Sequence, residues 1–591
     1  MLKIVENIYS LKENRIFIFV LFAFSLFFKC AFFNYSITGH YLLGSIIKNP
    51  IYFLFFYSSC IGVSFFIASF LVIIKKKYWI IIVSLLLDLL FMSNIIYYRA
   101  NDLLINGHAI LMTNNMSGFW NSVIVYFRYI DLIFLSLTVC LSCFLFCFND
   151  KSKFSMSWKT WMLLLLLSFS FFMVKAVHTM KWNNWNIRTA SNIYKYDSIK
   201  DFNYYITYYD PIHYFIMASC QSFSLLSHQT QNRTIVMNMD DEYRIKQRLC
   251  INKATPKVQN DSLSHLYVIL VESLESWVIN NQYTPNIVRF MDDNKNHLLY
   301  ANKVRHQTKR GTSMDAQLLV NTGILPTKED IVCNFYYNNY FFSLADIYKQ
   351  SGNRTQMLVP HDKKIWNQNY MSKAFHFDSL ASFDHYGNDR ELFSELIHYV
   401  SDKSNKYVQT ITISSHVPFE HEKKEYILEL PDNIEKNSNI PTSMKLYLKS
   451  VHYMDSQLGK FLNSIDYSNS ILLIAGDHTW ESYLTENCTE QTRSLLHKED
   501  SVYIPVIIYA PQINKNIQIQ ETVYQMDIYP TILSLLNRTD YVWQGFGVDL
   551  SDSVAIRNRT YNEEDAYDLS DKIIRSDYFR YVKDSLLIES K

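Results

Sequence analysis

The sequence predicts a two-part fold, in which an N-terminal domain of five transmembrane helices precedes a C-terminal α/β domain. Five apolar stretches, each near the ~20 residues that cross a bilayer as a helix, are complete by about residue 178. Beyond about residue 263, short β-branched or apolar runs alternate with helical patterns. Such alternation is typical of a largely parallel sheet that is covered by helices on both faces.

The composition bounds the class of protein. With 591 residues the chain is too long for one ordinary domain, and its hydrophobic residues, 49% of the total, are unevenly spread. The formal net charge of +1 argues against a nucleic-acid partner. We expect a transmembrane domain (1–178), a juxtamembrane connector (179–262), an outer domain (263–555) and its C-terminal tail (556–591).

The apolar stretches fall at 16–33, 51–74, 79–98, 130–148 and 158–178. Lysines and arginines are concentrated before the first stretch, at 75–77 and at 151–159, all on one side of the predicted membrane. By the positive-inside rule that side is cytoplasmic, so an odd number of spans places everything after residue 178 outside. The first stretch lacks a small-residue cleavage site, and we expect it to stay as an anchor.

The connector contains one mixed apolar stretch at 212–226, which predicts a helix, either at the membrane surface or in a plain packing role. Four cysteines after the last span would face an oxidising compartment, which leaves room for one or two disulfide bonds. Their spacing fixes no pairing. They are Cys220, Cys250, Cys333 and Cys488.

Chemistry-bearing residues follow the predicted strands of the outer domain. The strands are expected at 266–273, 355–360, 407–416, 471–478 and 502–511, with a helix at about 450–462. In α/β folds, ligands gather at the carboxyl ends of parallel strands. Those ends carry Glu272, His361 with Asp362, His416, and Asp477 with His478.

Three of these residues suit a metal ion. Asp477 and His478 follow an apolar strand and a glycine that lets the chain turn, and Glu272 ends another apolar strand. A buried carboxylate without a partner is costly, and carboxylates with an imidazole suit Mn²⁺, Zn²⁺ or Mg²⁺. Taken alone, an Asp-His pair also fits a helix cap beside a surface histidine.

A candidate nucleophile lies in the segment 310–326. Thr312 and Ser313 follow Gly311 just before a helical pattern. A hydroxyl there is either a plain N-cap or a nucleophile beside backbone N–H groups that can hold a phosphate. Only the combination with the predicted metal ligands favours the nucleophile.

Seven short motifs follow one another along the outer domain: VESLESW, TPN, HQTKRGTSMD, SSHVPF, AGDH, QMDIYPTIL and GFGVDL. In these motifs and in their order, the outer domain resembles the alkaline phosphatase and sulfatase superfamily. With five preceding spans, the chain is similar to phosphoglycerol transferases of the lipoteichoic acid synthase type.

The resemblance implies that Glu272, Asp477 and His478 bind one divalent ion together with the nucleophile oxygen. Mn²⁺ is the first expectation, and Mg²⁺ or Zn²⁺ are alternatives. For the nucleophile, the family pattern of Gly, any residue, Thr or Ser, any residue, acidic residue selects Ser313, and a slip of one position selects Thr312. The resemblance also implies a substrate-binding set of His416, His361, Asp362, Trp366 and Arg310.

Two departures from the family pattern bear on the substrate. No Cys/Ser-x-Pro-x-Arg motif lies near residue 313, which disfavours sulfate-ester hydrolysis. Gln368 stands where the family has an arginine, two residues after Trp366, so the head group stays open. Lys363, Lys364 or Arg310 are the candidates for the missing positive charge.

The resemblance implies a multi-pass enzyme of a bacterial cytoplasmic membrane with its catalytic domain on the extracytoplasmic side. The expected reaction moves a phosphoglycerol-type head group from a membrane glycerophospholipid to an envelope glycan, glycolipid or polymer, through a covalent Ser/Thr phospho-enzyme. Phosphoethanolamine transfer and a membrane-tethered phosphodiesterase or sulfatase-like hydrolase are the alternatives. A non-catalytic membrane scaffold would be expected to lack a ligand or the nucleophile.

Overall fold

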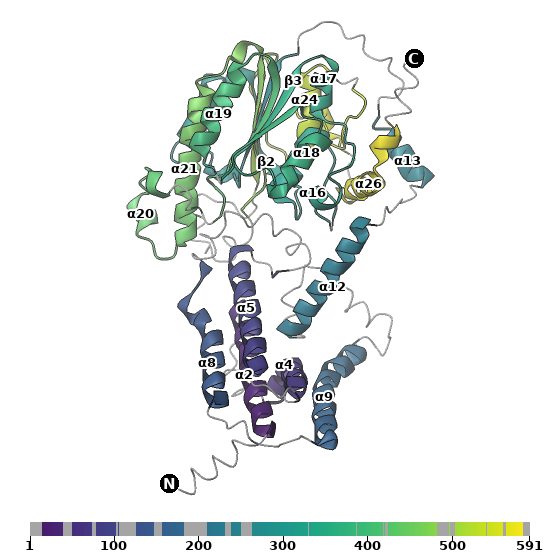
Figure 1. Cartoon of the computed structure of the whole chain (residues 1–591). Coiled ribbons are helices and arrows are strands. Elements are labelled where there is room, and N and C mark those ends of the chain that lie inside the picture. Colours follow the sequence, from purple (N-terminus) through teal and green to yellow (C-terminus); the bar gives the residue numbers. More distant parts are fainter. Residues whose placement is uncertain are drawn as a thin grey trace. The chain divides into compact units, whose positions relative to one another are not determined.

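The computed structural model divides the chain into two compact units, which we describe separately (Figure 1). One unit consists of apolar helices and the other is an α/β domain. The boundaries that we predicted for four segments stay a prediction. The structure describes residues 15–38, 50–71, 73, 78–101, 104–105, 126–146, 157–182, 210–230, 238–249, 263–328, 330–385, 387–417, 419, 423–480, 494, 496, 503–538, 541–559 and 563–582.

The first unit contains a helix at each predicted apolar stretch. Among the described residues, four helical segments are long and apolar enough to cross a membrane, and the described side chains of a fifth helix, α4, cover a shorter apolar stretch. The expected transmembrane domain is therefore confirmed, with five as an approximate count. The helices are α2 (Arg15–Thr38), α4 (Pro50–Leu71), α5 (Tyr78–Asn101), α8 (Ile133–Phe146) after the 3₁₀ turn η2 (Tyr129–Leu132), and α9 (Trp158–Trp182).

A buried ion pair ties three of these helices together. Lys29 of α2 pairs with Asp88 of α5, and both side chains are almost fully buried. The Lys29 ammonium also donates to Ser84 Oγ at 2.8 Å and to Thr138 Oγ1 of α8 at 2.6 Å. Ionisable side chains in apolar helices are tolerated when they face one another inside the bundle.

The helix predicted in the connector is present as α12 (Pro211–Thr230). Four of its side chains, Ile212, Tyr214, Phe215 and Ala218, share one buried cluster with α2, α4, α5 and α8. Cys220 and Cys333 carry free thiols, whereas Cys250, Cys488 and positions 183–209 of the connector lie outside the described residues.

The second unit is built on a nine-stranded sheet with the order β4-β3-β5-β1-β6-β7-β2-β8, and β9 pairs with β2. All neighbouring strands are parallel except β7, which runs antiparallel to β6 and β2. The sheet is therefore mixed. Its strands are β1 (His265–Val271), β2 (Leu298–Arg305), β3 (Arg354–Val359), β4 (Ser379–Ser382), β5 (Asn405–Ile411), β6 (Ser470–Gly476), β7 (Ile504–Tyr509), β8 (Ile517–Ile519) and β9 (Val523–Tyr524).

Helices cover both faces of this sheet, as predicted (Figure 1). Along β1, alternate side chains enter two separate cores, because successive side chains of a strand point to opposite faces. One core contains α14 (Pro285–Asp293), α19 (Asp389–Ser401) and α21 (Thr442–Leu462). The other contains α15 (Thr312–Thr322), α17 (Leu344–Gln350), α24 (Ile528–Leu535) and α26 (Glu563–Ser576).

Shorter helices complete the described part of this unit. They are α13 (Met239–Lys246), α16 (Val332–Phe335), α18 (Gln368–Ala374), α20 (Asp432–Glu435) and α25 (Ser553–Arg557). For the site, the central feature is the parallel pair β1 and β6, in which Val271 lies opposite Gly476. The residues that follow these two strands must therefore emerge side by side.

Candidate active site

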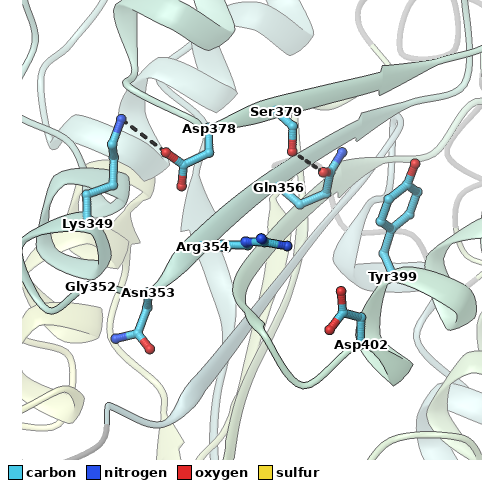
Figure 2. A pocket seen from close by; sticks show the side chains of 9 residues that line it. All are labelled: Lys349, Gly352, Asn353, Arg354, Gln356, Asp378, Ser379, Tyr399 and Asp402. Carbon is cyan, nitrogen blue, oxygen red and sulfur yellow. Dashed lines mark hydrogen bonds and ion pairs between the residues drawn. The ribbon is translucent and has the colours of Figure 1, made fainter.

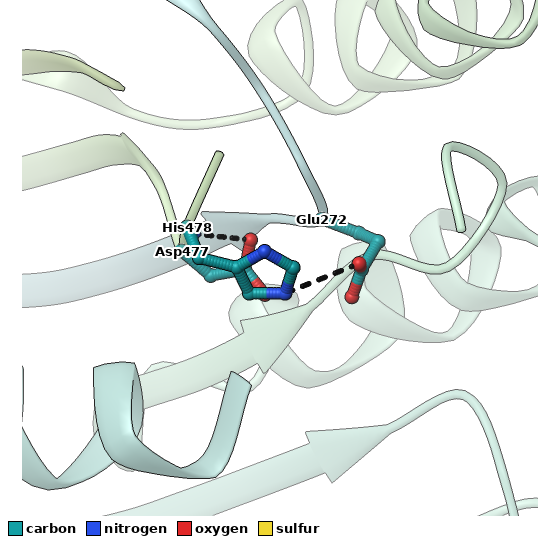
Figure 3. A group of neighbouring side chains, drawn as sticks. All are labelled: Glu272, Asp477 and His478. Carbon is teal, nitrogen blue, oxygen red and sulfur yellow. Dashed lines mark hydrogen bonds and ion pairs between the residues drawn. The ribbon is translucent and has the colours of Figure 1, made fainter. Parts of the chain in front are cut away.

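Glu272, Asp477 and His478 form one cluster at the carboxyl ends of β1 and β6 (Figure 3). Each offers a ligand atom, and these atoms lie within 4.8 Å of one another. His478 Nε2 is 3.4 Å from Glu272 Oε1 and 3.4 Å from Asp477 Oδ2. The structure thus brings together the three residues that the sequence nominates as metal ligands.

Gly476 makes the close approach of the two strand ends feasible. A Cβ at this position would collide with the carbonyl oxygen of Leu274 and lie 2.9 Å from Ile504 Cβ. Directly beyond it, Asp477 Oδ1 accepts the backbone N–H of Ser273 at 2.8 Å, and the Asp477 N–H donates to the carbonyl of Val271 at 3.1 Å. The carboxylate of Asp477 is therefore fixed against the β1 end.

The electrostatics of the cluster suit a cation. Burial alone would raise the pKa of Glu272, but the neighbouring His478 and His416 outweigh it and hold that pKa below its usual value. Burial and the adjacent Glu272 raise the pKa of Asp477 to about 7. Two buried carboxylates, an imidazole and a nearby hydroxyl form a donor set that Mn²⁺ or Zn²⁺ accept. The residues present fit one divalent ion.

Ser313 is the hydroxyl that reaches this cluster. Its Oγ donates to Glu272 Oε2 at 3.1 Å and lies 3.4 Å from His478 Nε2. Among the contacts of the described residues, Thr312 makes none to the cluster, and it has a positive φ of 38°. Gly311 occupies the N-cap position of α15, so neither hydroxyl serves as that cap. Ser313 instead lies in the first turn of α15, where the positive end of the helix dipole favours an anion.

Asp315 shapes the turn that presents Ser313. Its carboxylate is buried, and Oδ2 accepts the backbone N–H groups of Lys309 at 2.8 Å and Gly311 at 3.0 Å. Burial raises the pKa of Asp315 to about 7. The acidic residue of the family pattern therefore folds back over the glycine and fixes the chain before Ser313.

Two histidines of the predicted substrate set lie near the cluster. His416 is half-buried and lowers the pKa of Glu272 through its charge. His361 is buried just after β3, and burial, with an opposing contribution from Glu272, lowers its pKa to about 4. Asp389 orients the segment before His416, because its carboxylate accepts the N–H groups of Ile413 at 2.8 Å and Ser414 at 3.2 Å. The N-cap of α19 is the preceding residue Asn388, whose side chain accepts the N–H of Glu391.

The other three residues predicted for substrate binding are Asp362, Trp366 and Arg310. Asp362 Oδ1 accepts the N–H of Lys364 at 2.8 Å, as in an ordinary turn. Trp366 is half-buried against the core with a positive φ of 54°, and Arg310 is half-buried beside Gly311. Gln368 is almost fully buried, and its Oε1 accepts no hydrogen bond from any described residue.

Three residues near the cluster were not predicted as site residues. His306 Nε2 lies 3.1 Å from Thr479 Oγ1, next to His478. Gln525 accepts the N–H of Gln307 at 3.1 Å and donates to the carbonyl of Asp477 at 2.7 Å. His306, Gln307 and Gln525 all fall inside the family motifs, and that was the available signal. The contacts that give them their positions join segments that are far apart in the sequence, so no local pattern predicts them.

A pocket of about 620 Å³ lies at the amino ends of strands β3 and β4, away from the carboxyl ends that carry the cluster (Figure 2). It is lined by Arg354 and Ser379 at the amino ends of β3 and β4, and by the ion pair of Lys349 with Asp378 at 3.2 Å. No residue predicted for the active site lines it. Because ligands of parallel sheets bind at the carboxyl ends, the cluster of Figure 3 is the better candidate.

Comparison with known families agrees with this geometry. Residues 265–538 match the Sulfatase family, so the second unit contains a sulfatase domain of the alkaline phosphatase superfamily. Residues 1–223 match the lipoteichoic acid synthase N-terminal domain. With both domains in this order, the chain is homologous to lipoteichoic acid synthases.

Two relatives come from Bacillus subtilis (strain 168). Lipoteichoic acid synthase 2 is 25% identical over 381 residues, which cover 58% of this chain and 56% of the relative. Lipoteichoic acid synthase-like YvgJ is 23% identical over 297 residues, which cover 45% of this chain and 46% of the relative. The chain thus matches about half the length of these curated relatives.

Among solved structures, the fold resembles the integral membrane protein lipooligosaccharide phosphoethanolamine transferase A from Neisseria meningitidis. The TM-score is 0.55 at 14% identity, with 88% of this chain and 96% of that chain covered. At this identity the likeness concerns the fold, which combines apolar helices with a sulfatase-like domain.

Proposed function

We propose that this chain is a metal-dependent phosphotransferase of the membrane surface. It moves a phosphoglycerol-type head group from a membrane glycerophospholipid to an envelope glycan, glycolipid or polymer. The observation that carries the proposal is the position of Ser313, whose hydroxyl contacts both Glu272 and His478 at the N-terminus of α15. A hydroxyl so placed is a nucleophile for phosphorus.

In the first step, Ser313 Oγ, ionised by loss of its proton to solvent, attacks the phosphodiester of the lipid, and the bond from phosphorus to the diacylglycerol oxygen breaks. The positive end of the α15 dipole, at the first turn that carries Ser313, favours the anionic phosphoryl group. His416 donates a proton to the departing diacylglycerol oxygen. The product is a phosphoserine that carries the head group.

In the second step, a hydroxyl of the acceptor attacks the phosphoserine, and Ser313 Oγ leaves. The acceptor proton passes to His416, which is then ready for the next lipid. A divalent ion held by Glu272, Asp477, His478 and Ser313 would lower the pKa of the serine hydroxyl and offset charge that develops on the phosphoryl group.

The apolar helices suit a lipid donor, because an enzyme held at the bilayer meets head groups at a high effective concentration. The domain match to lipoteichoic acid synthases favours phosphoglycerol as the head group. It also supports a multi-pass protein of the cytoplasmic membrane with the sulfatase domain on the extracytoplasmic side, as the positive-inside rule predicts.

Phosphoethanolamine is the second candidate head group. Gln368 stands where the family has an arginine, and its buried Oε1 is an acceptor without a donor among the described residues. A buried acceptor of this kind is costly unless a ligand supplies the donor. The ammonium of ethanolamine and a hydroxyl of glycerol are both donors of this kind, so Gln368 does not discriminate between the two head groups.

The test is mass spectrometry of the full-length protein after incubation with Mn²⁺ and vesicles of phosphatidylglycerol or, separately, phosphatidylethanolamine. We expect a head-group phosphate adduct on the 310–315 peptide, lost in Ser313→Ala and kept in Thr312→Ala. The mass of the adduct identifies the head group. If neither lipid gives an adduct or released diacylglycerol, the transferase proposal is wrong and a hydrolase of another ester takes its place.

A further inference from the structure

The helix α26 contacts the segments before and after α15, although it lies beyond the residues that match the Sulfatase family. Before α15, the Tyr567 hydroxyl donates to the carbonyl of Gln307 at 2.7 Å, and Gln307 Nε2 donates to Glu563 Oε1 at 3.2 Å. After α15, Ser570 Oγ accepts the N–H of Leu325 at 3.0 Å. We call residues 306–311, which lead into α15, the nucleophile loop.

Gln307 connects this helix to the metal-ligand cluster. Its backbone N–H donates to Gln525 Oε1, and Gln525 Nε2 donates to the carbonyl of Asp477 at 2.7 Å. Gln307, Gln525 and Tyr567 are all buried. A buried hydrogen-bond chain of this kind fixes the nucleophile loop relative to the strand end that carries Asp477.

Tyr567 makes a second contact with the same loop. The Lys309 ammonium lies 4.4 Å from the centroid of the Tyr567 ring, which is within the range of a cation-π interaction. The Lys309 side chain is otherwise exposed. Lys309 also stands on the loop that leads to Ser313, four residues before it, and its backbone N–H donates to Asp315 Oδ2 at 2.8 Å.

We propose that α26 braces the nucleophile loop, with Tyr567 as the positioning residue that fixes Gln307 and holds the Lys309 ammonium at the rim of the site. There Lys309 attracts the anionic phosphodiester of the donor. The role of Lys309 rests on the proposed function, whereas the brace does not. Because the family's arginine is replaced by Gln368, Lys309 supplies a positive charge from a different element.

The experiment compares five forms of the full-length protein in phosphatidylglycerol-containing micelles with Mn²⁺: wild type, Tyr567→Phe, Lys309→Met, Lys309→Arg and Lys328→Met. Lys328 is the matched control, because it also contacts α26, through Asp568 at 2.6 Å, but is exposed and outside the loop. The readouts are hydrogen exchange of the 306–311 peptide, binding of inorganic phosphate by calorimetry, and kcat and KM for diacylglycerol release.

Tyr567→Phe keeps the ring that faces Lys309 and removes the hydroxyl that donates to the Gln307 carbonyl. One lost hydrogen bond corresponds to a roughly fivefold faster exchange of the loop, and we expect a similar fall in kcat with KM unchanged. Lys309→Met raises KM and weakens phosphate binding by about three- to fivefold, as befits an exposed charge. Lys309→Arg restores both, and Lys328→Met behaves as wild type.

The brace by α26 and the role of Lys309 can each be refuted without the other. Loop exchange in Tyr567→Phe that equals the wild-type rate overturns the brace. Phosphate affinity in Lys309→Met that equals that of Lys328→Met overturns the role of Lys309. If the wild type releases no diacylglycerol, the proposed function fails, and exchange and phosphate binding still decide the brace and Lys309.

Discussion

Replacing Gly311 by alanine tests how the nucleophile loop is held. A Cβ at Gly311 would collide with Asp315 Oδ1 and lie 2.6 Å from Asp315 Cγ. Gly311 itself has an ordinary φ of −83°, so the substitution strains no backbone angle and acts through this collision alone. The Asp315 carboxylate must withdraw, and it then loses the hydrogen bonds from Lys309 N and Gly311 N.

The magnitude follows from those two bonds. Each hydrogen bond to a buried carboxylate contributes roughly 1.5–3 kcal/mol, and partial relaxation lowers the sum to about 2–4 kcal/mol. We therefore expect Gly311→Ala to destabilise the second unit by that amount and to lower kcat at least tenfold, because Ser313 shifts from Glu272. Asp315→Ala loses the same bonds without the collision.

The assay is a double-mutant cycle. Denaturation of the full-length protein in micelles, followed by tryptophan fluorescence, gives stability, and diacylglycerol release gives kcat. Gly311→Ala combined with Asp315→Ala should cost no more than Asp315→Ala alone, within about 0.5 kcal/mol. Gly352→Ala is the control, because a Cβ at this position meets nothing within 4 Å, whereas the φ of Gly352 is +72°. We expect this variant to lose about 1 kcal/mol of stability through backbone strain and to keep the wild-type kcat. Additive effects in the cycle, or a fully stable and active Gly311→Ala, would refute the reasoning.

Three further predictions concern other parts of the protein. Ser313→Ala should abolish diacylglycerol release whereas Thr312→Ala should retain most of it, and the reverse order would make Thr312 the nucleophile. Burial and Glu272 raise the pKa of Asp477 to about 7, so Mn²⁺ must displace a proton from this carboxyl below that pH. Calorimetry should show that the affinity for Mn²⁺ falls by up to about tenfold per pH unit below pH 7 and is constant just above pH 7. Lys29→Met removes the cation that pairs with the buried Asp88, at a cost of about 3–5 kcal/mol, and should lower the yield of folded protein in size-exclusion chromatography. The double variant Lys29→Met with Asp88→Leu should recover that yield. If it does not, the pair does more than satisfy its own charges.

The central site could be predicted because its signal is local. Glu272 and Asp477 each follow a continuous apolar run, and buried parallel strands produce such runs. The carboxyl-end rule then places them together without any knowledge of the strand order. β7 was predicted as a strand, but its antiparallel direction was not, because periodicity carries no information on direction.

Two other strands, β2 and β4, lack the continuous apolar run that predicts a buried strand. β2 mixes buried and partly exposed positions without a regular period and contains Asn302 and Lys303, and β4 has only four residues, at the sheet edge. Neither forms an apolar run, so the sequence predicted neither as a strand. The choice between Ser313 and Thr312 also required the structure. A shift of one residue on a helix turns a side chain by about 100°, and this rotation decides whether a hydroxyl meets Glu272.

The brace by α26 marks the limit of what the sequence can predict. Tyr567 donates to the backbone carbonyl of Gln307, 260 positions earlier in the chain. A carbonyl is present at every residue, so the contact requires no particular side chain at position 307 and leaves no pattern there. The metal ligands differ, because their chemistry restricts each position to a few residue types. The groups that would contact the phosphate can therefore be predicted from the sequence, whereas the groups that hold them in place are found only once the fold is known.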